Sequence, residues 1–298
     1  MGAVAQQGFG IGEVVMCKKW RTPGVLGFLF LAGVLSAEAA EDAAVTPWVE
    51  AQAARVRLLA GADQPGKGVL AGVEIVMAEG WKTYWRNPGE AGVPPNFDWS
   101  GSSNTASIKV GYPAPMRISD PAAEMIGYKT SVLFPISIMP QVPGEPVDLR
   151  LALEFAVCRE ICIPAQAALE LKLPPARRLG APAAALAAAQ ARVPRAQGSL
   201  RASDPQLLAV RSTLSGPSPR LEIDAAFPGG NGGADLFLEP PDGIFVPMAQ
   251  KLSAAGDGRV RFLVDLTRAG NAEELKGKDL KLTLVSDAGA SEATVRIE

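Results

Sequence analysis

The chain has 298 residues, three cysteines and a formal net charge of −2. This length suffices for two domains of common size with a hydrophobic core each, and the near-neutral charge provides no basic field to attract nucleic acid or anionic lipid. Histidine is absent, which excludes Ser/His and Cys/His triads, a histidine general base and any zinc or copper site that needs imidazole.

The first 39 residues are typical of a signal peptide. A positive n-region at residues 18–21 precedes an apolar run at residues 24–35, which is too short to span a bilayer comfortably. Residues 37–39, Ala-Glu-Ala, fit a small-x-small cleavage site, and a short membrane anchor is the alternative. We therefore expect an exported, periplasmic protein that does not insert into the membrane after cleavage and that keeps two cysteines in an oxidising compartment.

Residues 45–174 have the pattern of a β-rich domain. Short β-prone runs are separated by Gly, Pro and Asn clusters, and several of them alternate apolar and polar residues. The runs are residues 56–59, 68–77, 108–110, 132–139, 149–157 and 168–173. Short antiparallel strands at this spacing predict a sandwich.

An aromatic segment at residues 80–89 lies in the middle of this half. One interpretation is a strand and turn whose indoles fill the sandwich core, and we favour it for Trp81. In the other interpretation, Trp85 and Arg86 border a site beside the Pro-Gly turn. The sequence leaves both open.

Two cysteines, Cys158 and Cys162, follow the fifth run with three residues between them. In a flat strand their Cα atoms would be about 13 Å apart, at about 3.3 Å per residue, whereas a disulfide needs about 5.5 Å. If they pair, the segment must turn back as one helical turn or a tight hairpin. A ring this small removes little unfolded-state entropy, about 2 kcal/mol against about 4.7 kcal/mol for a loop of about 100 residues, which favours a bond made to be opened.

The two sulfurs are expected to differ in burial. Cys158 follows the apolar stretch 153–157, whereas Cys162 leads into a turn at Pro164. We therefore predict that Cys158 is the more buried sulfur and resolves the exchange, and that Cys162 is the more open one and is attacked first.

After residue 174 the pattern changes. Residues 175–198 are rich in Ala and Pro and predict a linker that contains one short helix at residues 183–192. Residues 199–298 then predict a second β-sandwich, with runs at residues 207–213, 220–225, 235–239, 259–266 and 278–285. This part has no cysteine and no polar cluster of evident chemical role, so we interpret it as a docking or spacing domain. The expected fold class is all-β, with two immunoglobulin-like sandwiches joined by the Ala-rich linker.

Four short motifs occur in the order expected of one family. They are Gly80-Trp81-Lys82-Thr83-Tyr84-Trp85-Arg86-Asn87-Pro88-Gly89, then Tyr112-Pro113, then Glu124-Met125-Ile126-Gly127-Tyr128, and then Val157-Cys158 with Cys162-Ile163-Pro164. Together they resemble the periplasmic N-terminal domain of the thiol:disulfide interchange protein DsbD, most of all its ScsB (suppressor of copper sensitivity) branch and stand-alone relatives. The resemblance covers residues 48–173.

The resemblance implies an immunoglobulin-like domain with a redox-active cysteine pair and no cofactor. Such a domain takes electrons from a membrane-embedded donor of the DsbD/ScsB type and passes them to exported thioredoxin-like or other oxidised proteins. The processes that it serves include cytochrome c biogenesis and copper tolerance. On this basis Cys158 and Cys162 carry thiol-disulfide exchange, as a component of a protein-disulfide reductase system.

The same resemblance assigns a capping loop at residues 123–128. Met125, Ile126 and Tyr128 are its candidates for covering sulfur. If buried near the pair, Glu124 would be a candidate for proton transfer, although a lone glutamate is more commonly a surface residue. This chain departs from the family in two ways, because the DsbD domain has a wider cysteine spacing and an aromatic residue where Met125 stands.

Two other classes of function remain open. The same thiolates, with Met125 as a third soft ligand, are the alternative of a periplasmic Cu(I)-binding protein of copper tolerance. Two thiolates separated by three residues and followed by Pro resemble the copper-chaperone pattern, although that pattern usually recruits a histidine. The third class is an inert disulfide in a scaffold domain, which the small ring disfavours.

Overall fold

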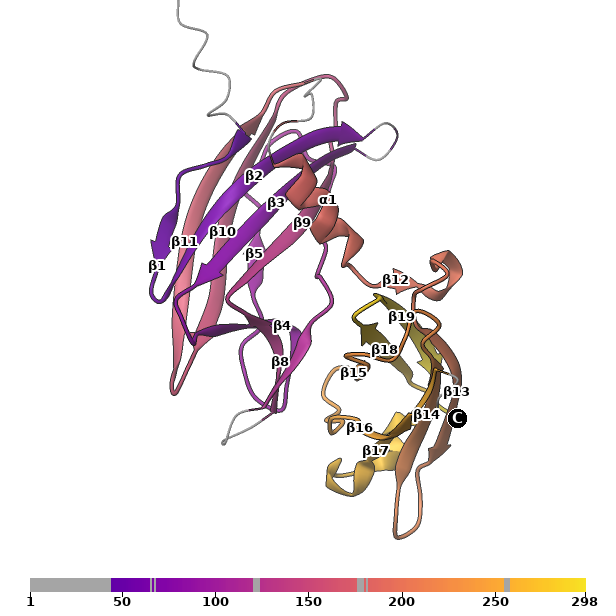
Figure 1. Cartoon of the computed structure of the whole chain (residues 1–298). Helices are drawn as coiled ribbons and strands as arrows, with labels where there is room; N and C mark the ends of the chain where they lie inside the picture. The colour runs from indigo at the N-terminus through magenta and orange to yellow at the C-terminus, as the bar shows by residue number, and fades with distance from the viewer. Residues whose placement is uncertain are drawn as a thin grey trace, which may run out of the picture. The chain divides into compact units, whose positions relative to one another are not determined.

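The computed structural model describes residues 44–64, 66, 68–119, 124–175, 180, 182–254 and 258–298. The expected signal peptide at residues 1–39 lies outside this part of the chain. Within the described part, no helix is long and apolar enough to cross a membrane. Strands dominate it, and its one α-helix is α1 (Ala183–Ala191) (Figure 1). The all-β class predicted from the sequence is confirmed.

The part before residue 175 consists of two sheets (Figure 1). Its strands are β1 (Val49–Ala51), β2 (Ala54–Gln64), β3 (Gly68–Met77), β4 (Lys82–Gly89), β5 (Asn96–Asp98), β6 (Ser107–Val110), β7 (Met116–Ser119), β8 (Glu124–Lys129), β9 (Ser131–Met139), β10 (Val147–Cys158) and β11 (Cys162–Leu173). One sheet has the order β1-β2-β3-β9-β6. The other has the order β11-β10-β4-β8-β7, with β5 paired to β10.

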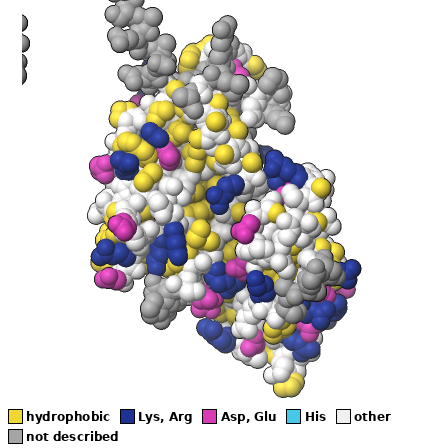
Figure 2. Space-filling model, viewed as in Figure 1, with side chains coloured by type: hydrophobic (Ala, Val, Ile, Leu, Met, Phe, Trp, Pro, Cys, Tyr) yellow, Lys and Arg dark blue, Asp and Glu magenta, His cyan; other side chains and the backbone are white. Residues whose placement is uncertain are grey.

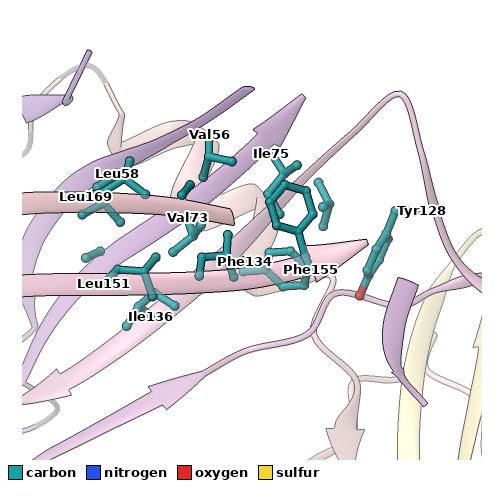
Figure 3. Packing of buried hydrophobic residues seen from close by; sticks show 14 of the residues in the cluster. Val56, Leu58, Val73, Ile75, Tyr128, Phe134, Ile136, Leu151, Phe155 and Leu169 are labelled. Carbon is teal, nitrogen blue, oxygen red and sulfur yellow. The ribbon is translucent and has the colours of Figure 1, made fainter. Parts of the chain in front are cut away.

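The core of this part lies between the two sheets. Figure 3 shows Val56 and Val73 from the first sheet meeting Leu151 and Leu169 from the second, and all four are buried. Because successive side chains of a strand point to opposite faces, alternate residues of the long strands β10 and β11 enter this core. The alternation found in the sequence therefore marks a sandwich, as predicted.

Strand β11 begins earlier than the sequence suggests. The predicted run starts at residue 168, whereas the strand begins at Cys162. It lies at the edge of its sheet, and its side chains alternate between buried and exposed from Gln166 onward. An edge strand tolerates Pro164, which lacks the N–H for a ladder hydrogen bond. The turn that this proline predicts is therefore absent, and the strand runs through it.

Residues 195–298 form two four-stranded sheets, with the orders β12-β19-β18-β15 and β13-β14-β17-β16. The strands are β12 (Arg195–Ala196), β13 (Gln206–Thr213), β14 (Arg220–Ala226), β15 (Asp235–Glu239), β16 (Gln250–Ala254), β17 (Arg259–Asp265), β18 (Asp279–Ser286) and β19 (Gly289–Arg296), with 3-10 turns η3 (Gln197–Ser199), η4 (Leu266–Arg268) and η5 (Ala272–Leu275). A separate hydrophobic cluster, which includes Ile223, Phe262 and Leu282, fills the space between them.

Helix α1 packs on the first sandwich. Its Leu186 is fully buried and contacts Leu59 and Leu70. Gly72 makes room for this leucine, because a Cβ at that position would lie 2.5 Å from Leu186 Cδ2. One buried leucine thus holds the Ala-rich helix against the five-stranded sheet.

Charged side chains of the surface pair locally. On the face drawn in Figure 2, basic and acidic side chains are interspersed. Arg261, for example, donates from Nε and Nη2 to the two carboxylate oxygens of Asp224, at 2.7 and 3.2 Å. Exposed pairs of this kind contribute roughly 0–1 kcal/mol each, so the apolar cores are the main source of stability.

Candidate redox site

The two cysteines lie directly opposite each other in an antiparallel hairpin. Cys158 ends β10, Cys162 begins β11, and the two are paired in the strand register. Their Cα atoms are 4.2 Å apart, and a disulfide joins the sulfurs. The loop of three residues between them is closed by a hydrogen bond from Arg159 N to Ile161 O, of 3.2 Å. Of the two geometries compatible with pairing, the chain adopts the tight hairpin.

The two cysteines differ strongly in burial. Cys158 is 2% exposed, whereas Cys162 is an exposed residue. Ile161, at the tip of the hairpin, is 67% exposed. The difference follows from position, because β10 has neighbours on both sides whereas β11 is an edge strand. The predicted order of burial is therefore found.

Tyr84 contacts both sulfurs. Its hydroxyl oxygen lies 2.8 Å from Cys158 Sγ and 3.0 Å from Cys162 Sγ, and its side chain is buried. Strand β4 pairs with β10 so that Lys82 lies opposite Cys158, and period-two alternation puts Tyr84 on the same face as Lys82. A phenol so placed can donate a hydrogen bond to a thiolate when the disulfide opens, which favours the charged sulfur.

Gly92 brings the backbone after β4 against the ring of Tyr84. A Cβ at this position would lie 2.3 Å from Tyr84 Cε1. Its φ of +138° is also a backbone conformation that side-chain-bearing residues rarely adopt. A glycine is required here on both grounds, and the segment around it covers the face of the tyrosine.

The expected capping loop is a strand, which corrects the sequence-based prediction. Glu124–Lys129 is β8, paired with β7 on one side and with β4 on the other. Residue 123 lies outside the described part of the chain. On one face of this hairpin, Met125 and Ile118 pack with Tyr84, Ala156 and Cys158 in a small buried cluster.

The other three cap candidates lie on the opposite face of β8. Alternation separates Glu124, Ile126 and Tyr128 from Met125. Glu124 accepts a hydrogen bond from Arg117 Nη1, of 2.9 Å, and Ile126 belongs to the main core. Tyr128 donates its hydroxyl to Pro113 O at 2.8 Å, and burial raises the pKa of Tyr128 well above its usual value. Figure 3 shows Tyr128 at the edge of the core cluster, beyond Phe155. The structure thus brings only Met125 to the cysteines.

Charges near the hairpin loop are exposed and opposed. Arg159 lies 5.6 Å from the ring centroid of Trp81 and 3.8 Å from Glu160. Both charged side chains are more than half exposed, so water screens their effect on sulfur. Trp85 is fully buried in the core, and Arg86 pairs with Glu239 and Glu292; neither borders the disulfide.

The described residues contain no cluster of three or more His, Cys, Asp or Glu side chains that could hold a metal ion. The alternative set of Cys158, Cys162 and Met125 is not of this kind, because its third ligand is a methionine thioether, which is a soft donor. Met125 and Cys158 belong to the same buried cluster. A reduced site would therefore offer two thiolates with a thioether beside one of them.

Comparisons with known proteins agree on one family. Residues 48–174 match the sequence profile of the thiol:disulfide interchange protein DsbD, N-terminal. Among solved structures, the N-terminal periplasmic domain of ScsB from Proteus mirabilis matches with a TM-score of 0.65 and 26% sequence identity, over 85% of this chain and 98% of that chain. No curated protein matches the chain.

Met125→Ala is expected to speed reduction of the disulfide by dithiothreitol several-fold, because it removes the side chain that covers Cys158. The equilibrium potential should change much less, since a cover alters access more than relative bond energies. Stopped-flow thiol titration measures the rate. Tyr128→Phe is the matched control: it lies on the other face of β8, and its rate should equal that of the parent. Equal rates in both variants would show that β8 does not cover the pair.

Tyr84→Phe is expected to slow opening of the disulfide by dithiothreitol. A hydrogen bond to a charged group contributes about 1.5–3 kcal/mol, which corresponds to a rate lower by about tenfold to a hundredfold. The ring is retained, so the cover over Cys158 stays in place. Tyr112→Phe, at a partly buried position packed against the main core, is the control and should leave the rate unchanged. An unaltered rate in Tyr84→Phe would exclude a role for the hydroxyl.

Proposed function

Because residues 48–174 belong to the family of DsbD N-terminal domains, we propose that the chain is a periplasmic thiol-disulfide exchange protein that relays electrons between a membrane-embedded reductase and exported thioredoxin-like or other oxidised proteins. The observation that carries the proposal is the geometry of the pair: an edge hairpin presents Cys162, keeps Cys158 buried, and places the Tyr84 hydroxyl against both sulfurs. A purely structural disulfide does not require one exposed and one buried sulfur.

The exchange runs through Cys162. A thiolate of the reductase attacks Cys162 Sγ, the bond between the two sulfurs breaks, and Cys158 Sγ leaves as a thiolate. Tyr84 donates its hydrogen bond to the departing sulfur. A second reductase thiolate then releases Cys162, so that the reductase carries the new disulfide and this chain carries two thiols. In the next half-reaction Cys162 attacks the disulfide of an oxidised client, and Cys158 resolves the mixed disulfide, which returns the chain to its oxidised form.

The proposal also assigns a role to each part of the chain. Residues 45–174 are the redox domain, residues 175–198 connect it to the rest, and residues 199–298 are a second β-sandwich. A hydrophobic cluster that lies wholly within the second half supports this division, while Phe237, Val285 and Ala290 of that half join the core of the first. The membrane-embedded donor and the exported acceptors are separate proteins. The periplasm, to which the matching ScsB domain belongs, is the proposed compartment.

Copper(I) binding is a second candidate, favoured by the presence of Met125 and Cys158 in one small buried cluster. The reduced protein would then bind one Cu(I) through Cys158 and Cys162 with help from the thioether. In this case Met125→Ala weakens Cu(I) binding in a competition titration with a chromophoric chelator, whereas Met139→Ala, at an exposed position, does not. Equal affinities in both variants would remove Met125 from the ligand set.

Trapping of mixed disulfides tests the relay. Cys158→Ala leaves the exposed Cys162 without its resolving partner, so it should accumulate mixed disulfides with both a membrane protein and an exported thioredoxin-like protein. Cys162→Ala retains only the buried Cys158 and should trap far less. Non-reducing electrophoresis and mass spectrometry identify the adducts. Capture of neither class by Cys158→Ala contradicts the relay.

A further inference from the structure

Arg117 links the hairpin that covers Cys158 to the second half of the chain. It lies on β7, opposite Ile126 in the register and on the other face from Ile118. Its guanidinium donates to both carboxylate oxygens of Asp235, at 3.0 and 2.8 Å, to Ala249 O at 2.8 Å and to Glu124 at 2.9 Å. One side chain thus connects β7, β8, the start of β15 and the segment before β16.

The ion pair between Arg117 and Asp235 has the features of a strong one. It is bidentate, and each side chain is only about one-fifth exposed (21% and 20%), so water screens it less than a surface pair. Asp235 is held in place by the N–H of Leu236, which donates to the same carboxylate at 2.8 Å. Burial lowers the pKa of Arg117, but the hydrogen bonds and charges of Asp235 and Glu124 outweigh it, and the net shift is upward.

Apolar packing beside this ion pair is incomplete. A pocket of about 340 Å³ is lined by Asn87, Gly89 and Ile126 and by residues 236–238, 240 and 243–249 of the second half. Atoms that line a void have no partner on its far side, so dispersion attraction across it is weak. Phe237, Val285 and Ala290 of the second half share a buried cluster with Ile126, and the guanidinium fork of Arg117 adds the polar contact that ties the hairpin itself to Asp235 and Ala249.

The position of the hairpin bears directly on exchange chemistry. Cys158 is the proposed leaving sulfur, and it sits in a cluster where Met125 and Ile118 exclude water. A thiolate leaves poorly into apolar surroundings. Any displacement of β7 and β8 admits water to this sulfur and widens the approach for an attacking thiol.

We propose that Arg117 and Asp235 are positioning residues through which the second half of the chain holds the β7–β8 hairpin over Cys158 and so limits the rate at which the disulfide is exchanged. This inference rests on the proposed exchange function, because a limit on the exchange rate has a role only if the disulfide is exchanged. Its geometry does not depend on which proteins are the partners.

A second, weaker tether accompanies the first. Glu90, just before the segment that covers Tyr84, lies 3.6 Å from Arg268. Arg268 is 69% exposed, and exposed pairs of this length contribute little. The two tethers are thus expected to differ greatly in effect, with Arg117 dominant.

The test is the rate of disulfide reduction by dithiothreitol in full-length variants. Arg117→Ala and Asp235→Asn should each be reduced about tenfold faster than the parent, which corresponds to about 1.4 kcal/mol. The double variant should be no faster than the faster single variant, because the two residues form one interaction. The reduction rate of Arg117→Lys should lie between those of the parent and Arg117→Ala, since lysine keeps the positive charge but cannot form the bidentate pair. The equilibrium potential should stay near that of the parent in every variant.

Two controls separate positioning from general loosening of the fold. Arg261→Ala removes another bidentate Arg–Asp pair, within the second half, and should leave the rate unchanged; Glu90→Gln should change it less than twofold, as expected of an exposed pair. Urea unfolding checks that each variant remains folded. Parent-like rates in folded Arg117→Ala and Asp235→Asn overturn the proposal. Additive effects in the double variant overturn it as well. Both results concern a small thiol, so a failure of the partner relay in the trapping experiment leaves them intact.

Discussion

The register between β10 and β11 is the constraint on which the site depends. Because Cys158 and Cys162 are cross-strand partners, their side chains project from the same face of the sheet. The next strand, β4, pairs with β10 so that this face also carries Tyr84. A shift of one residue in either pairing would turn one partner into the core and separate the sulfurs from the hydroxyl. The geometry of the proposed redox site is thus a consequence of strand pairing, with no flexible loop among the described residues that contact sulfur.

Burial and hydrogen bonding act in opposite directions on Cys158. The apolar cluster around it disfavours a thiolate, and the Tyr84 hydroxyl at 2.8 Å favours one. Cys162 lacks that enclosure because β11 has a neighbour on one side only. The two sulfurs of a symmetric bond are therefore made unequal by their strands: one is accessible to a partner, and the other is protected until the bond opens. Such an inequality would give the proposed exchange a direction of attack.

Much of this arrangement could be predicted from the sequence. The β-prone runs at residues 68–77 and 235–239 coincide with β3 and β15, and the four motifs point to the family whose sequence profile residues 48–174 match. The cap is harder to predict, because Met125, Ile126 and Tyr128 are all apolar and close together. Only the pairing of β8 with β4 decides which of them faces sulfur. Sequence reasoning misses Tyr84 for a related reason: it stands between two tryptophans, and its role depends on a register that local sequence does not reveal.

The second half shows the same limit at longer range. Asp235 and Glu239 delimit a five-residue strand and resemble ordinary solvated ends of an edge element. Their partners, Arg117 and Arg86, are 118 and 153 residues away in the chain. No short window of sequence contains both members of either pair, so the polar residues of this half show no chemical role in the sequence alone. Once paired, they bind the two strands, β7 and β4, that carry the cover and the tyrosine of the redox site. The second half, which has no cysteine, thus contacts the strands that pack around the disulfide without contacting the disulfide itself.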